Sequence, residues 1–119
     1  DAFGAGRSIK EAVQPLMFAV NGRTVCAFAF SRSLPESFWA KKWRAGTANA
    51  SFTQTKKLIS ECNNRGFFTI GIFHWGAELM PKPKDYQKKL ARLVVDGGAD
   101  LVLGHHPHIL QSVEIYKGK

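Results

Sequence analysis

Three histidines lie within four residues near the end of the chain, in the run Gly104-His105-His106-Pro107-His108. The fourth, His74, directly follows the apolar run 67–73. A neutral imidazole is the side chain that proteins use most often to hold a transition metal. Because three imidazoles in four residues have no packing advantage, the pattern predicts a metal site at the ends of two hydrophobic runs.

The types and spacing of these residues are typical of a hydrolytic metal centre. His106 and His108 flank a proline that stiffens the backbone, so both can reach one metal or two neighbouring metals. His74 supplies a third nitrogen, and Glu78 is a candidate oxygen ligand or general base. His105 is a further candidate ligand, with support of the ligands or contact with a substrate oxyanion as its alternative role. A metal held in this way lowers the pKa of a bound water and stabilises charge on the attacked group.

A helix and a strand are predicted to deliver His74. Ser51 and Gln54 form a capping box that begins the helix, and Gly66 is placed for a left-handed cap after its end. The strand 67–73 follows. Four residues at helical spacing form the predicted buried face of this helix: Thr55, Leu58, Ile59 and Cys62.

A second helix and strand are predicted to deliver the histidine run. The helix begins at Asp85 and ends at Gly97-Gly98, and the strand 101–103 follows. Strands joined by a crossover helix lie parallel, so both strands end at the same edge of the sheet, where ligands of open α/β sheets bind. We therefore expect His74 to lie beside the histidine run. The apolar stripe of this helix is Tyr86, Leu90, Leu93 and Val94.

Carboxylates that could bridge two metals are few in this segment. Asp96 and Asp100 flank the glycine pair at the opposite end of the strand, where helix termination and capping explain them better. The remaining acidic candidates are Glu78 and Glu114.

The other elements complete an α/β pattern. A short helical turn is predicted near 9–13, and the strand 16–20 is joined through the hairpin signal Asn21-Gly22 to a return strand over 24–30. The return strand is apolar on both faces, which suits the interior of a sheet covered by helices. A last strand is predicted over 109–116. The predicted fold is a mixed sheet flanked by helices.

Residues 31–50 are the least regular part and contain Trp39 and Trp43 among basic residues. We interpret them as a long loop whose tryptophans pack back on the domain, with Lys41, Lys42 and Arg44 in water. The alternative is a surface that stacks the bases of single-stranded nucleic acid. We do not expect nucleic acid to be the partner.

Two cysteines, Cys26 in a strand and Cys62 on a helix, have no motif around them. They are expected to be buried free thiols.

Length and charge limit the possible roles. At 119 residues the chain is at most one domain, and no apolar run approaches the roughly 20 residues that cross a bilayer. The formal net charge of +8 favours polyanionic partners such as nucleic acid, anionic lipid or an acidic polymer. Because the basic residues are scattered without a long run, we favour a solvated basic surface as the explanation. The chain begins without methionine, and we expect it to be a segment of a longer protein.

The motifs as a whole resemble those of one family. They are His74-Trp75-Gly76-Ala77-Glu78, then Gln87, Leu90 and Ala91, then the continuous run 96–108, and finally Gln111, Glu114 and Tyr116-Lys117-Gly118-Lys119. Near the start, Gly4-Ala5-Gly6-Arg7, Glu11-Ala12 and Pro15 add to the pattern. These runs closely resemble the bacterial capsule-synthesis proteins of the CapA type, also called poly-γ-glutamate biosynthesis proteins.

The resemblance implies a fold and a ligand set. The fold would be part of a calcineurin-like metallophosphoesterase α/β sandwich, with residues 1–119 as one segment of that domain, truncated at both ends. His74, His106 and His108, with His105 as a further candidate, would be its carboxy-terminal metal ligands. The full domain would hold divalent metal ions, two in number, with Mn, Zn, Fe and Mg as candidates. The family's other ligands lie outside this chain, so we expect the segment alone to be inactive.

The resemblance also implies a role. We expect a metal-dependent hydrolase-like protein in the synthesis, anchoring or processing of capsular poly-γ-glutamate or a similar anionic cell-surface polymer. The alternative is a non-catalytic subunit of a polymer synthase or export complex. The implied partners are the polymer and membrane-bound synthase subunits, and the implied location is the cell envelope or extracytoplasmic surface.

Overall fold

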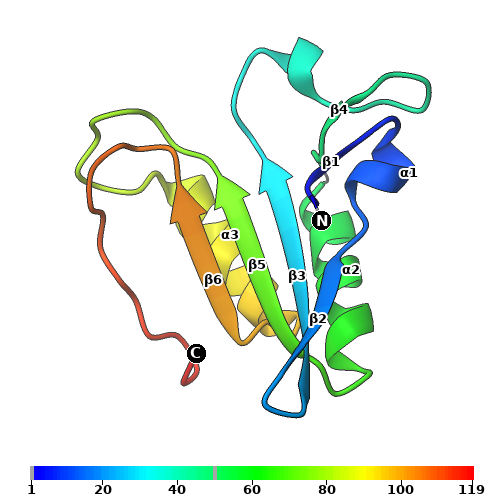
Figure 1. Cartoon of the computed structure of the whole chain (residues 1–119). Coiled ribbons are helices and arrows are strands. Elements are labelled where there is room, and N and C mark those ends of the chain that lie inside the picture. Colours follow the sequence, from blue (N-terminus) through cyan, green and yellow to red (C-terminus); the bar gives the residue numbers. More distant parts are fainter. Residues whose placement is uncertain (1, 50) are drawn as a thin grey trace.

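The computed structural model describes residues 2–49 and 51–119, which form a mixed four-stranded sheet with helices packed against it (Figure 1). The strand order is β2 (Leu16–Val20), β3 (Arg23–Ser31), β5 (Phe68–His74) and β6 (Leu101–His105). β2 and β3 are antiparallel, whereas β3, β5 and β6 run parallel. The predicted α/β class is therefore confirmed.

Short elements lie outside this sheet. β1 (Ala5–Gly6) and β4 (Gly46–Thr47) pair antiparallel beside the four-residue helix α1 (Ile9–Ala12), and a 3-10 turn, η1 (Glu36–Phe38), precedes β4. The predicted hairpin joins β2 to β3, with Asn21 and Gly22 at φ 49° and 76°. Positive φ at both residues matches the turn expected from Asn-Gly.

Two long helices provide the parallel crossovers and cover one face of the sheet (Figure 1). α2 (Phe52–Asn63) begins with the predicted capping box, in which Ser51 Oγ accepts from the Gln54 amide and Gln54 Oε1 accepts from the Ser51 amide. α3 (Asp85–Asp96) ends at the predicted glycine pair. Their buried positions include Thr55, Ile59, Cys62, Leu90 and Val94, as their spacing predicted.

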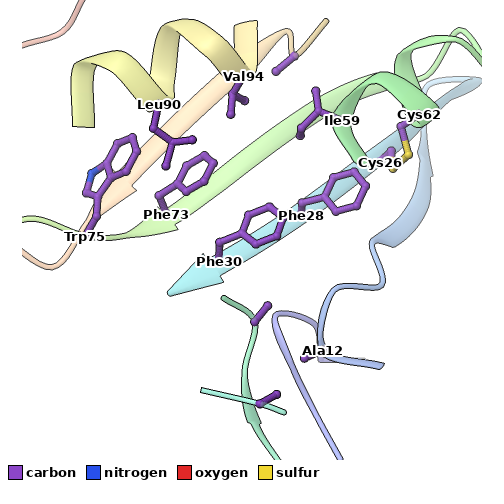
Figure 2. Packing of buried hydrophobic residues seen from close by; sticks show 13 residues of the cluster. Ala12, Cys26, Phe28, Phe30, Ile59, Cys62, Phe73, Trp75, Leu90 and Val94 are labelled. Carbon is purple, nitrogen blue, oxygen red and sulfur yellow. A yellow bond between two sulfur atoms is a disulfide. The ribbon is translucent and has the colours of Figure 1, made fainter. Parts of the chain in front are cut away.

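The core between the helices and the sheet contains a row of stacked aromatic rings (Figure 2). Phe28 and Phe30 of β3 are followed by Phe73 of β5 and then Trp75, with ring centroids 6.1, 5.6 and 4.7 Å apart along the row. Gly104 of β6 leaves room for the end of this row, because a Cβ there would lie 2.5 Å from Trp75 Nε1. The row carries the packed core to the edge of the sheet where the histidines lie.

The opposite face of the sheet is apolar and largely uncovered by the described residues. The strand registers place five partly exposed side chains on it, each with 38–47% of its surface exposed: Phe18, Val20, Phe68, Leu101 and Leu103. His74 and His105 have the same parity as these residues in β5 and β6, so the two histidines belong to this open face.

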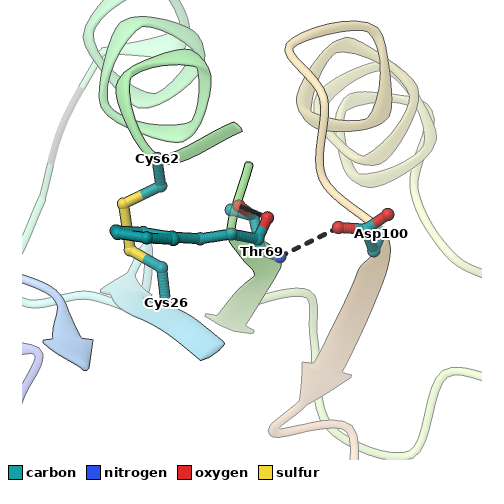
Figure 3. The surroundings of a disulfide bond; sticks show 5 residues. Cys26, Cys62, Thr69 and Asp100 are labelled. Atoms are coloured by element: carbon teal, nitrogen blue, oxygen red, sulfur yellow. Dashed lines mark hydrogen bonds between the residues drawn. A yellow bond between two sulfur atoms is a disulfide. The ribbon is translucent and has the colours of Figure 1, made fainter. Parts of the chain in front are cut away.

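The two cysteines are not free thiols as expected but form a disulfide that joins β3 to α2 (Figure 3). α2 lies directly over β3, which brings the Cys26 and Cys62 Cα atoms to 6.3 Å, a distance that a disulfide spans. Both residues are buried. Nearby, Asp100 accepts a hydrogen bond from the Thr69 amide at 2.9 Å, so it joins the ends of two strands away from the histidines.

Residues 109–116 are not the strand that the sequence predicted. They run as extended coil beside α3, and no described strand pairs with them. Side-chain contacts hold this segment against α3: Glu114 accepts from Arg92 at 2.9 Å and Asp96 accepts from Lys117 at 2.6 Å. The outer edge of β6 stays unpaired among the described residues, and Leu110, Val113 and Ile115 of the coil remain exposed.

The loop prediction for residues 31–50, of which residue 50 lies outside the described residues, holds for one tryptophan and is wrong for the other. Trp39 is half-buried, and its indole Nε1–H donates to the Ser33 carbonyl at 2.9 Å. Trp43 is 87% exposed, because it occupies the tip of a tight turn that projects from the domain.

Candidate functional site

The candidate site lies at the carboxyl edge of the parallel strands, where β5 and β6 end side by side (Figure 1). His74 and His105 are register partners across these strands, and their ring centroids are 4.9 Å apart. The next residue, His106, brings its ring to 4.4 Å from that of His74, and His108 lies 5.9 Å beyond His106. The crossover topology thus gathers all four histidines, as predicted.

Two loops form the site, and hydrogen bonds join them. The Leu79 amide donates to the Pro107 carbonyl at 2.8 Å, and the Gln111 side chain donates to the Met80 carbonyl at 2.7 Å. Gln87, only 2% exposed, contacts Gln111 at 3.4 Å and fixes this junction to α3. These bonds hold residues 78–80 opposite residues 106–108.

The junction brings one carboxylate and two imidazoles together. One ligand atom from each of Glu78, His106 and His108 lies within 4.8 Å of the others, and His108 Nε2 is 3.8 Å from Glu78 Oε1. Two imidazoles and one carboxylate are a donor set that suits first-row divalent metals with open coordination positions. The side chains of Glu78 and His108 are more than half exposed, so a substrate could reach such a metal. The residues present therefore fit a metal of this class.

The loop backbones adopt conformations that L-residues seldom occupy. Leu79, His106 and His108 have φ of 56°, 102° and 58°. Non-glycine residues at positive φ are held there by surrounding structure, and they cluster at functional sites. Two of these residues, His106 and His108, belong to the cluster, and Leu79 directly follows its third member, Glu78.

His74 is oriented by a residue that sequence reasoning did not identify. Ser33 Oγ lies 2.6 Å from His74 Nδ1, and the Arg32 amide donates to the His74 carbonyl at 2.9 Å. Burial, followed by the neighbouring imidazoles, lowers the pKa of His74 below its ordinary value of 6.5. Burial and then His106 lower the pKa of His105 in the same direction. Both imidazoles are therefore neutral near pH 7, which is the state that binds metals.

The structure separates the predicted site residues into two groups. Glu78, His106 and His108 share one cluster, whereas His74 and His105 lie beside it at the strand ends. Of the other carboxylates, Glu114 pairs with Arg92 and is not in the cluster.

Other supporting residues were not assigned a role from the sequence. The Gly76 amide donates to the Tyr86 hydroxyl at 2.7 Å, which holds the chain just after His74. Gln87 is buried at the loop junction. Tyr86 was assigned only to the apolar stripe. A glutamine at the third position of the helix that begins at Asp85 is a capping signal, and it could have identified Gln87 as a polar residue with a structural role.

A groove of about 1040 Å³ opens beside the cluster. It lies between β6, α3 and the coil 109–116, and all four histidines are among its lining residues. Much of its wall is apolar, with the aliphatic side chains of Leu101 and Leu103 among the lining residues. An extended chain would have room to lie along it.

Comparisons with known proteins agree with the resemblance seen in the sequence. The family model described as "Bacterial capsule synthesis protein PGA_cap" matches residues 1–119. The chain is 36% identical over 119 residues to the PGA biosynthesis protein CapA of Bacillus subtilis (strain 168), and the match covers 99% of this chain and 31% of that protein. It is 34% identical over 121 residues to the capsule biosynthesis protein CapA of Bacillus anthracis, and that match covers 98% of this chain and 29% of the relative. The chain thus spans less than a third of these relatives, and it belongs to the bacterial capsule synthesis protein family.

Proposed function

We propose that this chain carries part of the metal site of a metal-dependent hydrolase-like protein that acts in the synthesis, anchoring or processing of capsular poly-γ-glutamate or a similar anionic cell-surface polymer. The observation that carries the proposal is the convergence of Glu78, His106 and His108 at the edge of the sheet. The names of the relatives from Bacillus support the capsular context.

The chemistry follows from the donor set. A divalent metal bound by Glu78, His106 and His108 would supply a Lewis acid for activating water. Two imidazoles favour Mn, Fe or Zn over Mg among the candidates. His74 and His105 stand neutral beside the cluster, where they can complete the ligand set, donate a hydrogen bond to a substrate oxygen or accept a proton. A second metal would need carboxylates from parts of the protein beyond this segment.

The substrate class is supported by charge and shape. The net charge of +8 favours an anionic polymer, and the groove beside His106 has room for an extended chain. We propose the cell envelope as the location, with membrane-bound synthase subunits as further partners. The buried Cys26–Cys62 disulfide supports an oxidising compartment. In the described part of the chain, no helix is long and apolar enough to span a membrane.

The alternative is a non-catalytic subunit of a polymer synthase or export complex. One observation favours it: the largely apolar groove beside the histidines could hold a polymer or a partner segment without any metal chemistry.

Metal content per chain tests the proposal. The protein is equilibrated with Mn²⁺ or Zn²⁺, freed of excess ion and analysed by elemental mass spectrometry, for this chain and for the longer parent protein. Glu78→Gln and the double variant His106→Ala/His108→Ala are compared with Glu61→Gln, a matched change on the exposed side of α2. Stoichiometric metal that is lost only in the site variants supports the metal centre, and phosphoester and γ-glutamyl substrates are then screened with the parent. No metal in the wild-type parent overturns the hydrolase proposal and favours the non-catalytic subunit.

A further inference from the structure

A tight turn outside the histidine cluster exposes a tryptophan, Trp43, at its tip. Residues 40–46, here called the Trp43 hairpin, form a tight turn in which the Lys41 and Arg44 amides donate to each other's carbonyls at 3.0 and 3.4 Å. Trp43 at its tip is 87% exposed. Burial of a large aromatic side chain is favourable, so a tryptophan held in water beside other exposed apolar groups is a candidate contact for a partner surface.

The Trp43 hairpin is held in place from several sides. Its Lys41 carbonyl accepts from the Ile9 amide at 3.0 Å, and the Ala40 amide donates to Thr47 at 2.9 Å. The Arg44 guanidinium donates to the carbonyls of Glu36 and Trp39 at 3.0 and 2.9 Å. The exposure of Trp43 is therefore a property of a fixed turn, which presents the indole without a large ordering cost on binding.

Cations and further apolar side chains surround the indole. The Lys42 ammonium lies 4.9 Å from the Trp43 ring centroid, and Lys41 lies 6.0 Å from that of Trp39. Leu34 and Phe38, in the segment just before the hairpin, are 74% and 62% exposed. No acidic residue occurs between Glu36 and Glu61. The surface thus combines exposed apolar groups with an excess of positive charge, since Lys41, Lys42 and Arg44 have a single carboxylate near them in the sequence, Glu36.

We propose that the Trp43 hairpin docks on the surface of an anionic lipid bilayer, with the indole at the headgroup level and Lys41 and Lys42 against lipid phosphates. Tryptophan is enriched at this depth of a membrane, and basic residues beside it are attracted to anionic headgroups. A soluble polyanion would engage the lysines but would leave Trp43, Phe38 and Leu34 in water. A bilayer surface uses both kinds of group, so the observations favour lipid.

Docking in this way would orient the candidate site. The hairpin is joined to the histidines through Trp39, whose indole bonds the Ser33 carbonyl, while the Ser33 hydroxyl contacts His74. In Figure 1 the segment that carries η1 and β4 stands at the same end of the sheet as the tips of β5 and β6. A docked protein would therefore hold the histidine edge close to the membrane.

Vesicle binding tests the proposal and does not depend on metal or on activity. Co-sedimentation is measured with vesicles of phosphatidylcholine alone and with vesicles that contain about 30% phosphatidylglycerol. Wild type is compared with Trp43→Ala, with Lys41→Gln/Lys42→Gln, and with Lys88→Gln/Lys89→Gln, a matched loss of two charges on exposed positions of α3. Circular dichroism confirms that each variant is folded, which is expected because the changed side chains are exposed.

The expected result is binding to the anionic vesicles only. Loss of Lys41 and Lys42 should weaken it about 25-fold, at roughly fivefold per charge, and loss of Trp43 about tenfold or more. The α3 variant should weaken it much less, and lipids brominated near the headgroup should quench wild-type tryptophan fluorescence but not that of Trp43→Ala. No vesicle binding by wild type, or binding that Trp43→Ala leaves unchanged, overturns the proposal. An equal loss of vesicle binding in the Lys41→Gln/Lys42→Gln and Lys88→Gln/Lys89→Gln variants also overturns the proposal. Binding of soluble poly-γ-glutamate through Trp43, without lipid binding, would instead assign the hairpin to the polymer.

Discussion

The disulfide between β3 and α2 leads to a stability prediction that can be worked from the structure. Cys26 and Cys62 are 36 residues apart, and closing a loop of that length removes chain entropy from the unfolded state equivalent to about 4 kcal/mol at 25 °C. A domain of this size has a total stability of about 5–15 kcal/mol. Removing the bond should therefore cost a large part of what keeps the chain folded.

The experiment compares wild type with Cys26→Ala/Cys62→Ala, each with and without reductant, by guanidinium unfolding followed by far-UV circular dichroism. With a slope of about 4 kcal/mol/M, the midpoint should fall by about 1 M in the variant. Reductant should lower the wild-type midpoint by a similar amount and leave the variant unchanged. A variant whose midpoint lies within about 0.2 M of oxidised wild type would refute the reasoning, as would intact mass spectrometry that finds two free thiols in the purified protein.

Three further predictions concern the site. With His74 as a further metal ligand, Ser33→Ala should weaken divalent metal binding about 10- to 100-fold by titration calorimetry, because the ring loses the group that orients it; an unchanged affinity would show that His74 does not ligate the metal. Gly104→Ala should destabilise the fold by about 1–3 kcal/mol in thermal melts, since its Cβ would collide with Trp75; an unchanged melting temperature contradicts this. Without metal, the free energy of unfolding should decline as the pH falls below 6.5, because the pKa values of His74 and His105 are lower in the folded chain and the unfolded chain therefore binds protons first. A His105→Asn variant should show a smaller decline between about pH 7.5 and 5. An equal decline in the variant would count against a lowered pKa for His105.

Local signals account for most of what the sequence predicted correctly. The capping box at Ser51, the hairpin at Asn21-Gly22 and the glycine pair after Asp96 each act through neighbours a few residues away. The buried faces of α2 and α3 were predicted from apolar residues that recur at helical spacing. The meeting of His74 with the histidine run needed one further rule, that parallel strands joined by a crossover helix end at the same edge.

The features that were missed depend on distant partners. Pairing of Cys26 with Cys62 requires that α2 lie over β3, a packing choice that no local pattern specifies. Ser33 reaches His74 across 41 residues from an irregular segment, so no spacing could identify it. The strand predicted over 109–116 is wrong because an apolar run does not determine whether the segment pairs with the free outer edge of β6 or, as here, lies against α3 through contacts such as Arg92–Glu114.

The open face of the sheet has a consequence for how this 119-residue chain, purified by itself, should behave in solution. Its apolar side chains would bring two molecules together, while the net charge of +8 keeps them apart. At physiological ionic strength that repulsion is screened beyond about 8 Å, and added sulfate also strengthens apolar attraction. Self-association should therefore increase with salt, the reverse of a complex held by charge, and purification in dilute buffer should keep the chain dispersed.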